Sequence, residues 1–290
     1  MSLDRFAPTH KRLFQISIVT PSFNQSKFIE EALLSVKQQA CPCLEHIIID
    51  GASTDGTVEI LERYSARPGW QHLRWISEPD RGQTDALNKG FRMASGNIVG
   101  WLNSDDRYRP GCFATVAREF ADYSEADVVY GDYTWMDEKG RVKRVRREIE
   151  FSPFVLSYHR VLYIASVSTF FRRRIFDEGN WLNPSFEYAM DYDLFLRLAS
   201  RGHKFHHVRS ILADFRWHSE SKSTIATQKQ RADHDAIAIL HSPVLQRVRQ
   251  TAFCAPTLAT LRATAAAARY WMKLTQGCYF GAIPPAKAPD

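Results

Sequence analysis

Short apolar runs along the first half of the chain alternate with segments whose apolar residues recur at helical spacing. The runs predict buried strands at 16–20, 47–49, 73–76 and 98–102. The helical spacing is clearest between residues 84 and 94. Strands that alternate with helices predict βαβ units, and therefore an α/β fold with a mixed, mostly parallel sheet flanked by helices.

The pattern changes after residue 127, where strands no longer alternate regularly with helices. A strand at 128–130 is followed by a predicted hairpin at 133–145. Further along, the spacing predicts a helix at 190–199 and strands at 205–208 and 211–217. These elements are expected to complete the same sheet.

The end of the chain reads as a helical addition to this domain. We therefore expect two parts, an α/β domain over 1–223 and a basic helical C-terminal extension over 224–290. In the extension, one apolar stripe is bordered by basic residues, which predicts either contact with an anionic membrane face or packing on the domain. The stripe consists of Leu258, Leu261, Ala265, Ala268 and Met272, and its border of Arg262, Arg269 and Lys273.

The distribution of charge argues against a nucleic-acid partner. The formal net charge is +6, but residues 1–223 hold 30 basic and 29 acidic side chains, whereas 224–290 hold 8 basic and 3 acidic ones. The basic runs at 141–147 and 172–174 are the best support for a non-enzymatic nucleic-acid-binding protein. They lack interleaved aromatic residues that could stack on bases, so we expect no nucleic-acid partner.

From cysteine usage and hydropathy we expect a cytoplasmic protein, with or without attachment to the inner face of the membrane. Five scattered cysteines do not suggest a disulfide framework, and we expect reduced thiols. The polar N-terminus contains no apolar core of a signal peptide. No uncharged apolar window is long enough to predict a membrane-spanning helix.

Carboxylates follow several of the predicted strands. Asp50 follows the second strand, Asp105 and Asp106 follow the fourth, and Asp191 and Asp193 begin a later helix. Because parallel strands end at one edge of their sheet, Asp50 and Asp105 are expected to line one cleft. Any one of them alone could be a turn former or helix cap, but together they favour a site for Mg²⁺ or Mn²⁺ with phosphate oxygens.

Five segments in order carry a more specific signal over residues 15–220. The segments are Val19-Thr20-Pro21-Ser22-Phe23-Asn24-Gln25, Asp50-Gly51-Ala52-Ser53-Thr54-Asp55-Gly56-Thr57, Ser77-Glu78-Pro79-Asp80-Arg81-Gly82-Gln83-Thr84-Asp85-Ala86-Leu87-Asn88-Lys89-Gly90, Gly100-Trp101-Leu102-Asn103-Ser104-Asp105-Asp106 and Ala189-Met190-Asp191-Tyr192-Asp193-Leu194. With them the chain resembles the family 2 glycosyltransferases of the GT-A fold, especially members that build bacterial polysaccharides and cell-surface glycans.

The resemblance implies a site for a nucleoside diphosphate sugar, with a UDP-sugar favoured. Pro21 and Phe23 match the segment that contacts the donor base, where the family usually has Tyr in place of Phe23. Asp50 matches the aspartate that accepts hydrogen bonds from the base or ribose. Arg81 and Asp85 match the segment that closes over the nucleotide.

The resemblance also implies a metal-assisted departure of the diphosphate. Asn103-Ser104-Asp105 stands at the Asp-x-Asp position, with Asn103 near the ribose and Asp105 as metal ligand. His218, in the segment Arg216-Trp217-His218-Ser219-Glu220-Ser221, resembles the late residue that meets the diphosphate or metal.

Asp191 matches the catalytic base of the family. The neighbouring position, usually Glu, holds Met190, and losing that carboxylate would lower the proton affinity of Asp191 unless burial compensates. The sequence thus predicts an inverting glycosyltransferase that acts on a glycan or lipid-linked acceptor. A sugar nucleotidyltransferase is the alternative enzyme, but the first strand is followed by no glycine-rich loop.

Overall fold

The computed structural model describes residues 14–39, 41, 44–186, 188–218, 227–251 and 254–279. Expectations that concern the polar N-terminus, Cys43 and the Ser219-Glu220-Ser221 end of the last motif lie outside these residues. The cysteines that are described are free thiols, namely Cys41, Cys112, Cys254 and Cys278.

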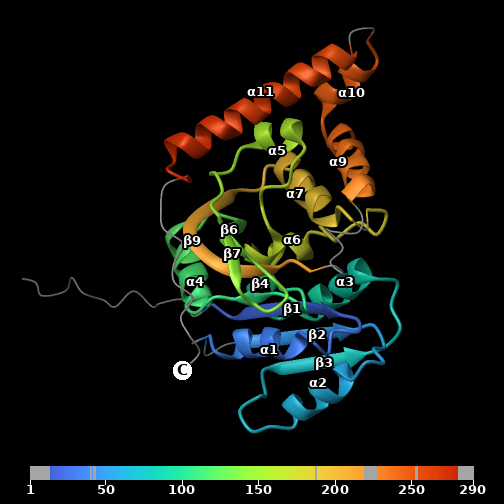
Figure 1. Cartoon of the computed structure of the whole chain (residues 1–290), viewed down its shortest axis with the longest axis vertical. Helices are drawn as coiled ribbons and strands as arrows, with labels where there is room; N and C mark the ends of the chain where they lie inside the picture. Colours follow the sequence, from blue (N-terminus) through green and yellow to red (C-terminus); the bar gives the residue numbers. More distant parts are fainter. Residues whose placement is uncertain are drawn as a thin grey trace, which may run out of the picture.

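One sheet runs through the molecule. Its strands are β1 (Ile16–Ser22), β2 (Leu44–Asp50), β3 (Leu73–Ser77), β4 (Ile98–Trp101), β5 (Arg107–Tyr108), β6 (Val128–Met136), β7 (Val142–Arg146), β8 (Thr169–Arg172) and β9 (Phe205–Arg216). The described strands form a nine-stranded sheet in the order β3-β2-β1-β4-β8-β6-β9-β5, with β7 paired to β6 (Figure 1). Strands β3, β2, β1 and β4 are parallel, as are β6 and β9, and β8, β7 and β5 pair antiparallel with their neighbours.

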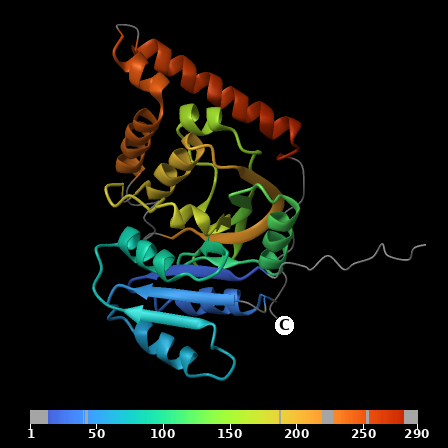
Figure 2. The same cartoon turned by 180° about the vertical axis from the view of Figure 1, so that it is seen from behind.

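Helices flank this sheet. They are α1 (Ile29–Lys37), α2 (Thr57–Ser65), α3 (Gln83–Met93), α4 (Cys112–Asp122), α5 (Pro153–His159), α6 (Arg174–Asp177), α7 (Met190–Ser200), α9 (Thr227–His241), α10 (Pro243–Arg249) and α11 (Cys254–Thr275), with a 3₁₀ turn η1 (Ser166–Ser168). Figures 1 and 2 show α1 and α2 beside the parallel strands at one end of the molecule, and α9 to α11 at the other end.

Helix α3 packs closely on β1. All seven residues of β1 are buried, so the strand is covered on both faces, as expected of a central parallel strand. A Cβ atom at Gly90 of α3 would lie 2.2 Å from Cγ1 of Val19. Glycine at this position therefore lets the helix approach the strand more closely than any other residue would.

The structure confirms the predicted alternation of strands and helices up to β4, and it corrects one prediction in the second half. Residues 205–208 and 211–217 do not form two strands, because β9 is continuous. Its pairing with β6 shifts register between Gly131 and Tyr133, where β9 carries extra residues as a bulge. The alternation of side chains is interrupted there, which made one strand look like two.

The apolar stripe of α11 packs on the protein. Ala265 is fully buried, and the other stripe residues contact the main hydrophobic core. Two residues of the basic border are bound to buried Glu148, with distances of 2.7 Å from Arg269 and 2.9 Å from Lys273. The stripe is thus covered by protein, which is the packing alternative considered above. No helix that the structure describes combines the length and apolarity that crossing a bilayer requires.

Candidate active site

A cavity of about 620 Å³ opens at the carboxyl ends of β1 and β4. It is the position at which parallel α/β sheets bind ligands. Six of the residues predicted for the site line this cavity, namely Pro21, Phe23, Asn103, Asp105, Asp191 and His218. They come from four separate segments of the chain, so the fold brings them together as the motifs suggested.

The loops after β1 and β2 form one wall of the cavity. Phe23 is 61% exposed, an unusual state for a phenylalanine in a well-packed domain. A Cβ atom on Gly51 would lie 3.3 Å from the Phe23 ring and 2.9 Å from Oδ2 of Asp80. A larger residue in place of Gly51 would therefore crowd the Phe23 ring, which lines the cavity and on which a planar group could stack.

Asp50 lies behind this wall rather than in it. Its side chain is fully buried and accepts hydrogen bonds from the Ser53 backbone N–H at 2.9 Å, the Ser53 hydroxyl at 2.6 Å and the Ser77 hydroxyl at 2.7 Å. These bonds hold the turn in which Ala52 has a φ of 62°, a conformation that is strained for alanine. In this structure Asp50 organises the loop that carries Gly51.

Arg81 and Asp85 lie beside the main cavity, in a smaller hollow of about 380 Å³. The backbone N–H of Arg81 donates to Asp85 Oδ2 at 3.2 Å, and Lys89 Nζ is 3.7 Å from the same oxygen. Gln83 lines both spaces. The predicted nucleotide-closing residues are therefore adjacent to the cavity but not among its lining residues.

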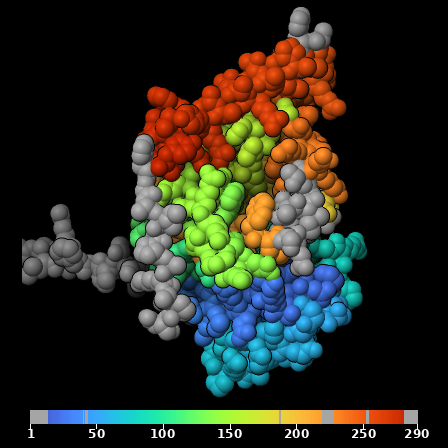
Figure 3. Space-filling view, in the orientation of Figure 1, coloured from blue at the N-terminus to red at the C-terminus, as the bar shows by residue number. Residues whose placement is uncertain are grey.

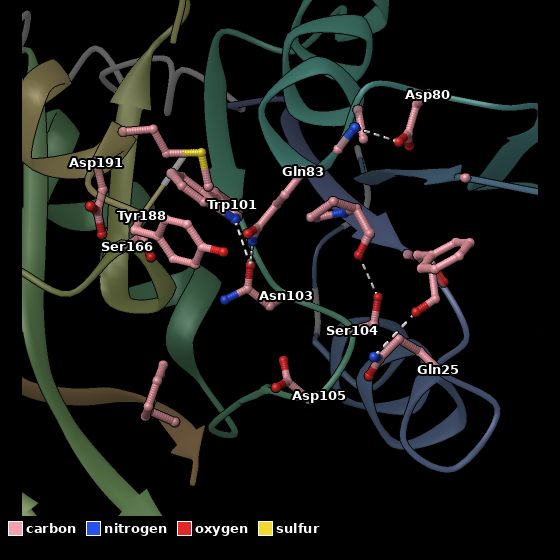
Figure 4. A pocket seen from close by; sticks show the side chains of 18 of the residues that line it. Gln25, Asp80, Gln83, Trp101, Asn103, Ser104, Asp105, Ser166, Tyr188 and Asp191 are labelled. Carbon is pink, nitrogen blue, oxygen red and sulfur yellow. Dashed lines mark hydrogen bonds between the residues drawn. The ribbon is translucent and has the colours of Figure 1, made fainter. Parts of the chain in front are cut away.

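The amide of Asn103 is fixed by hydrogen bonds on both of its ends. Its Oδ1 accepts from Gln83 Nε2 and from Trp101 Nε1, both at 2.8 Å (Figure 4). Its Nδ2 donates to Asp106 Oδ2 at 3.0 Å. An aspartate in this place would have no N–H group to donate to Asp106. The departure from the Asp-x-Asp pattern is thus explained by a site that needs both a donor and an acceptor.

The two predicted metal ligands meet at the cavity. His218 Nε2 lies 3.0 Å from Asp105 Oδ2, and Arg216 Nε donates to the Asp105 carbonyl oxygen at 2.6 Å. Among the described residues no group of three or more His, Cys, Asp or Glu side chains could hold a metal. A carboxylate and an imidazole facing one cavity still fit a divalent cation that takes its other ligands from a bound molecule and water.

Asp106 is a structural acid beside this pair. It is buried, and its oxygens accept from the Arg216 backbone N–H at 2.8 Å and from Asn103. Burial first, and the neighbouring charge of Asp105 second, raise the pKa of Asp106 well above its usual range. It ties the loop after β4 to the end of β9.

Asp191 lies in the first turn of α7, on another side of the cavity from Asp105, as Figure 4 shows. Its Oδ1 accepts from the Tyr192 backbone N–H at 2.8 Å. Desolvation by the surrounding protein raises the pKa of Asp191 to about 6, against the lowering effect of that hydrogen bond. Burial thus compensates for the missing glutamate. Met190 instead turns its sulfur to the Thr84 hydroxyl, 2.8 Å away.

Asp193 does not cap α7, contrary to one reading of the sequence. It pairs with Arg197 at 3.1 Å and with His241 of α9 at 2.8 Å. Helix α9 therefore rests on α7, and from it Gln230 reaches the cavity and donates to the Tyr188 carbonyl oxygen at 3.1 Å. The C-terminal extension contributes directly to the site, which the sequence analysis did not foresee.

Several residues that line the cavity were not predicted from the sequence. The ones without a prediction include Gln83, Trp101, Tyr188, Phe215 and Gln230. Gln83 and Trp101 stand inside recognised motifs and could have been chosen on that ground. Phe215 and Gln230 reach the cavity only through the packing of β9 and α9, which no local pattern reveals.

Comparison with known proteins agrees with this geometry. A family model described as "Glycosyl transferase family 2" matches residues 17–180. Among curated proteins, the chondroitin synthase of Escherichia coli is 29% identical over 234 residues, or 78% of this chain and 32% of that protein. The chain spans between 22% and 32% of the length of the first relatives that it matches.

Solved structures show the same fold at low identity. S. aureus TarS in complex with UDP-GlcNAc has a TM-score of 0.64 at 16% identity, over 91% of this chain and 74% of that one. The mannosyltransferase PcManGT from Pyrobaculum calidifontis, solved with GDP-Man and Mn²⁺, has a TM-score of 0.62 at 20% identity, over 93% and 77%. The GT-A fold expected from the motifs is thereby confirmed.

Proposed function

The chain belongs to glycosyl transferase family 2, and from this premise we propose that it transfers a sugar from a nucleoside diphosphate sugar to a hydroxyl group of a glycan or lipid-linked acceptor. The observation that carries the proposal is the joint placement of Asp191 and of the Asp105–His218 pair in one cavity. The family match gives no support to the nucleotidyltransferase alternative.

The donor nucleotide is proposed to bind against the wall formed by the loops after β1 and β2, on the side of the cavity that faces α3. The exposed ring of Phe23 stacks on the base, Pro21 lies beside it, and the loop held by Asp50 shapes this wall. Arg81 and Asp85, in the adjoining hollow, close over the donor from the side. TarS is solved with UDP-GlcNAc and PcManGT with GDP-Man, which supports a nucleotide sugar as the donor. We propose a UDP-sugar as the first candidate.

The diphosphate is proposed to lie against Asp105 and His218. Mg²⁺ or Mn²⁺ held by these two residues would neutralise the negative charge of the departing diphosphate. Asn103 contributes a neutral amide close to the ribose, and its position is set by Gln83 and Trp101. The Arg216 side chain holds the Asp105 backbone, so the carboxylate stays aimed at the cavity.

The transfer is proposed to invert the anomeric carbon. The acceptor oxygen attacks from the face opposite the diphosphate, the bond from the anomeric carbon to the diphosphate oxygen breaks, and the acceptor proton passes to Asp191. A carboxylate with a pKa of about 6 is mostly ionised at neutral pH and is still basic enough to take a proton.

A donor screen tests the proposed function. Thermal unfolding should be measured with UDP-, GDP- and dTDP-sugars, each with and without Mn²⁺. We expect one nucleotide class to raise the melting temperature by several degrees, with the larger rise in the presence of Mn²⁺. As a matched control, Phe23→Ala should reduce the rise and Phe23→Tyr should keep it. If no nucleotide sugar changes the melting temperature, the proposal fails.

The division of labour between 1–223 and 224–290 is part of the proposal. The first part supplies the groups that act on the donor and acceptor, and the extension closes the cavity with α9.

Peripheral membrane contact through α11 would use its outer side, where Tyr270 and Trp271 are 58% and 66% exposed. We propose that contact, and predict sedimentation with anionic vesicles but not neutral ones. Equal sedimentation of the wild type and a Tyr270→Ala/Trp271→Ala variant would contradict it.

A further inference from the structure

A row of side chains leads from the cavity across three strands to an exposed arginine. In the pairing of β9 with β6, Phe215 stands opposite Trp135, and in the pairing of β6 with β7, Trp135 stands opposite Arg144. Residues opposite each other in paired strands project from the same face of the sheet. Phe215 lines the cavity, so the row begins at the proposed site of transfer.

Two further residues complete this row, which we call the aromatic–arginine strip. Trp217 is 43% exposed and lies with its ring centroid 5.5 Å from that of Trp135 and 6.4 Å from that of Phe215. The guanidinium carbons of Arg144 and Arg146 lie 5.8 Å and 4.7 Å from the Trp135 ring centroid. In Figure 3 the lime-green surface of this hairpin faces the reader beside the orange end of β9.

The outer end of the strip carries an excess of positive charge. Arg146 is 3.4 Å from Glu148, and the same carboxylate also pairs with Arg269 and Lys273. Three cations therefore share one carboxylate at this place. Arg144, two residues before Arg146 on β7, adds an exposed guanidinium. The positive electrostatic potential here favours an anion. A guanidinium can bind a carboxylate or phosphate group through two parallel hydrogen bonds.

Resting on the proposed function, we propose that the aromatic–arginine strip binds an acceptor sugar chain that carries anionic groups. The C–H faces of pyranose rings are apolar and pack on aromatic rings, which Phe215, Trp217 and Trp135 provide. Two strand spacings separate Phe215 from Arg144, about 10 Å, which suits a short segment of such a chain. The terminal sugar of the acceptor reaches the cavity at Phe215, while anionic groups further along the acceptor contact Arg144.

Direct binding measurements test the strip without any donor. The probes are hexagalacturonate, a phosphorylated mannose pentamer, and fully methyl-esterified hexagalacturonate as the neutral counterpart. We expect the wild type to bind at least one anionic probe about tenfold more tightly than the ester, because only the anionic probes can pair with Arg144. A tenfold difference in affinity corresponds to about 1.4 kcal/mol. Arg144→Ala should remove that preference, and Trp217→Ala should weaken both the charged and the neutral probe. Both residues are exposed, so both variants should fold.

Arg67→Ala is the matched control, because Arg67 also stacks on an aromatic ring, that of Tyr64, at the far edge of the sheet. This variant should bind like the wild type. The inference is overturned if neither anionic probe is preferred over the ester, or if Arg144→Ala leaves the preference unchanged. It is also overturned if a 20-nucleotide oligothymidylate binds the strip more tightly than the sugars do. Nucleotide-dependent thermal shifts on the same samples separate a failure of this inference from a failure of the proposed function.

Discussion

Asp191→Asn is expected to lower the rate of sugar transfer by about 10²- to 10⁴-fold, the usual contribution of a positioned general base. The amide has nearly the shape of the carboxylate and can still accept the hydrogen bond from the Tyr192 backbone N–H. It cannot take a proton from the acceptor hydroxyl. Because Asp191 lies apart from the Asp105–His218 pair, binding of the nucleotide sugar should be nearly unchanged. The measurements are turnover with the donor found in the screen and its dissociation constant.

The wild-type pH profile gives a second readout of the same group. Burial raises the pKa of Asp191 to about 6, so the base is ionised above that pH and protonated below it. Transfer should therefore rise with pH through about pH 6 and then level off. Asp122→Asn, an equal change at an exposed position, should retain the wild-type rate and profile. Wild-type turnover by Asp191→Asn would remove Asp191 from the mechanism.

The parts of the fold that were predictable are those whose pattern is local. Residues such as Val19 belong to strands buried on both faces, which leave continuous apolar runs in the sequence. The bulge in β9 was not predictable, because it depends on how Gly131 and Tyr133 are paired with a distant strand. The packing of α11 was left open, since an apolar stripe with a basic border suits a lipid surface and a protein surface equally well. The buried carboxylate of Glu148 decides that question in the structure.

In the candidate site, too, the features set by local motifs were predictable, and those set by distant contacts were not. Asp105 and Asp191 were identified from motif positions, and the structure brings both to one cavity. The role of Asp50 as a buried loop anchor was not visible, because burial of a carboxylate depends on its donors, here Ser53 and Ser77. The raised proton affinity of Asp191 was also beyond the sequence, which showed only that the neighbouring glutamate was missing. Environment, rather than residue identity, supplies this property.

Arg216 illustrates why a motif can be read correctly and still be understood only in part. The sequence drew attention to its segment because of His218, two residues later. In the structure Arg216 is buried, binds Glu31 through its guanidinium, and holds the carbonyl oxygen of Asp105. The end of β9 therefore positions the loop after β4 as well as delivering the imidazole. Two distant segments form one support for the proposed metal site.

Asp105→Ala is expected to abolish the part of donor binding that depends on Mn²⁺ and to lower transfer by about 10²- to 10⁴-fold, as loss of several kcal/mol of charge stabilisation implies. The variant keeps the backbone carbonyl that Arg216 binds, so the fold should persist. His218→Ala should have a smaller effect in the same direction, because the carboxylate remains. Glu59→Ala, on the exposed side of α2, serves as the control.

Manganese itself supplies the decisive readout, because the electron paramagnetic resonance signal of free Mn²⁺ falls when the ion is bound. With the wild type, the nucleotide found in the screen should increase Mn²⁺ binding, since the two protein ligands need diphosphate oxygens to complete the coordination. Asp105→Ala should lose this increase, and EDTA should reduce wild-type transfer to the level of the variant. Full transfer in EDTA, together with unchanged nucleotide binding by Asp105→Ala, would show that Asp105 and His218 form only a structural hydrogen bond and that the diphosphate leaves without a metal at this place.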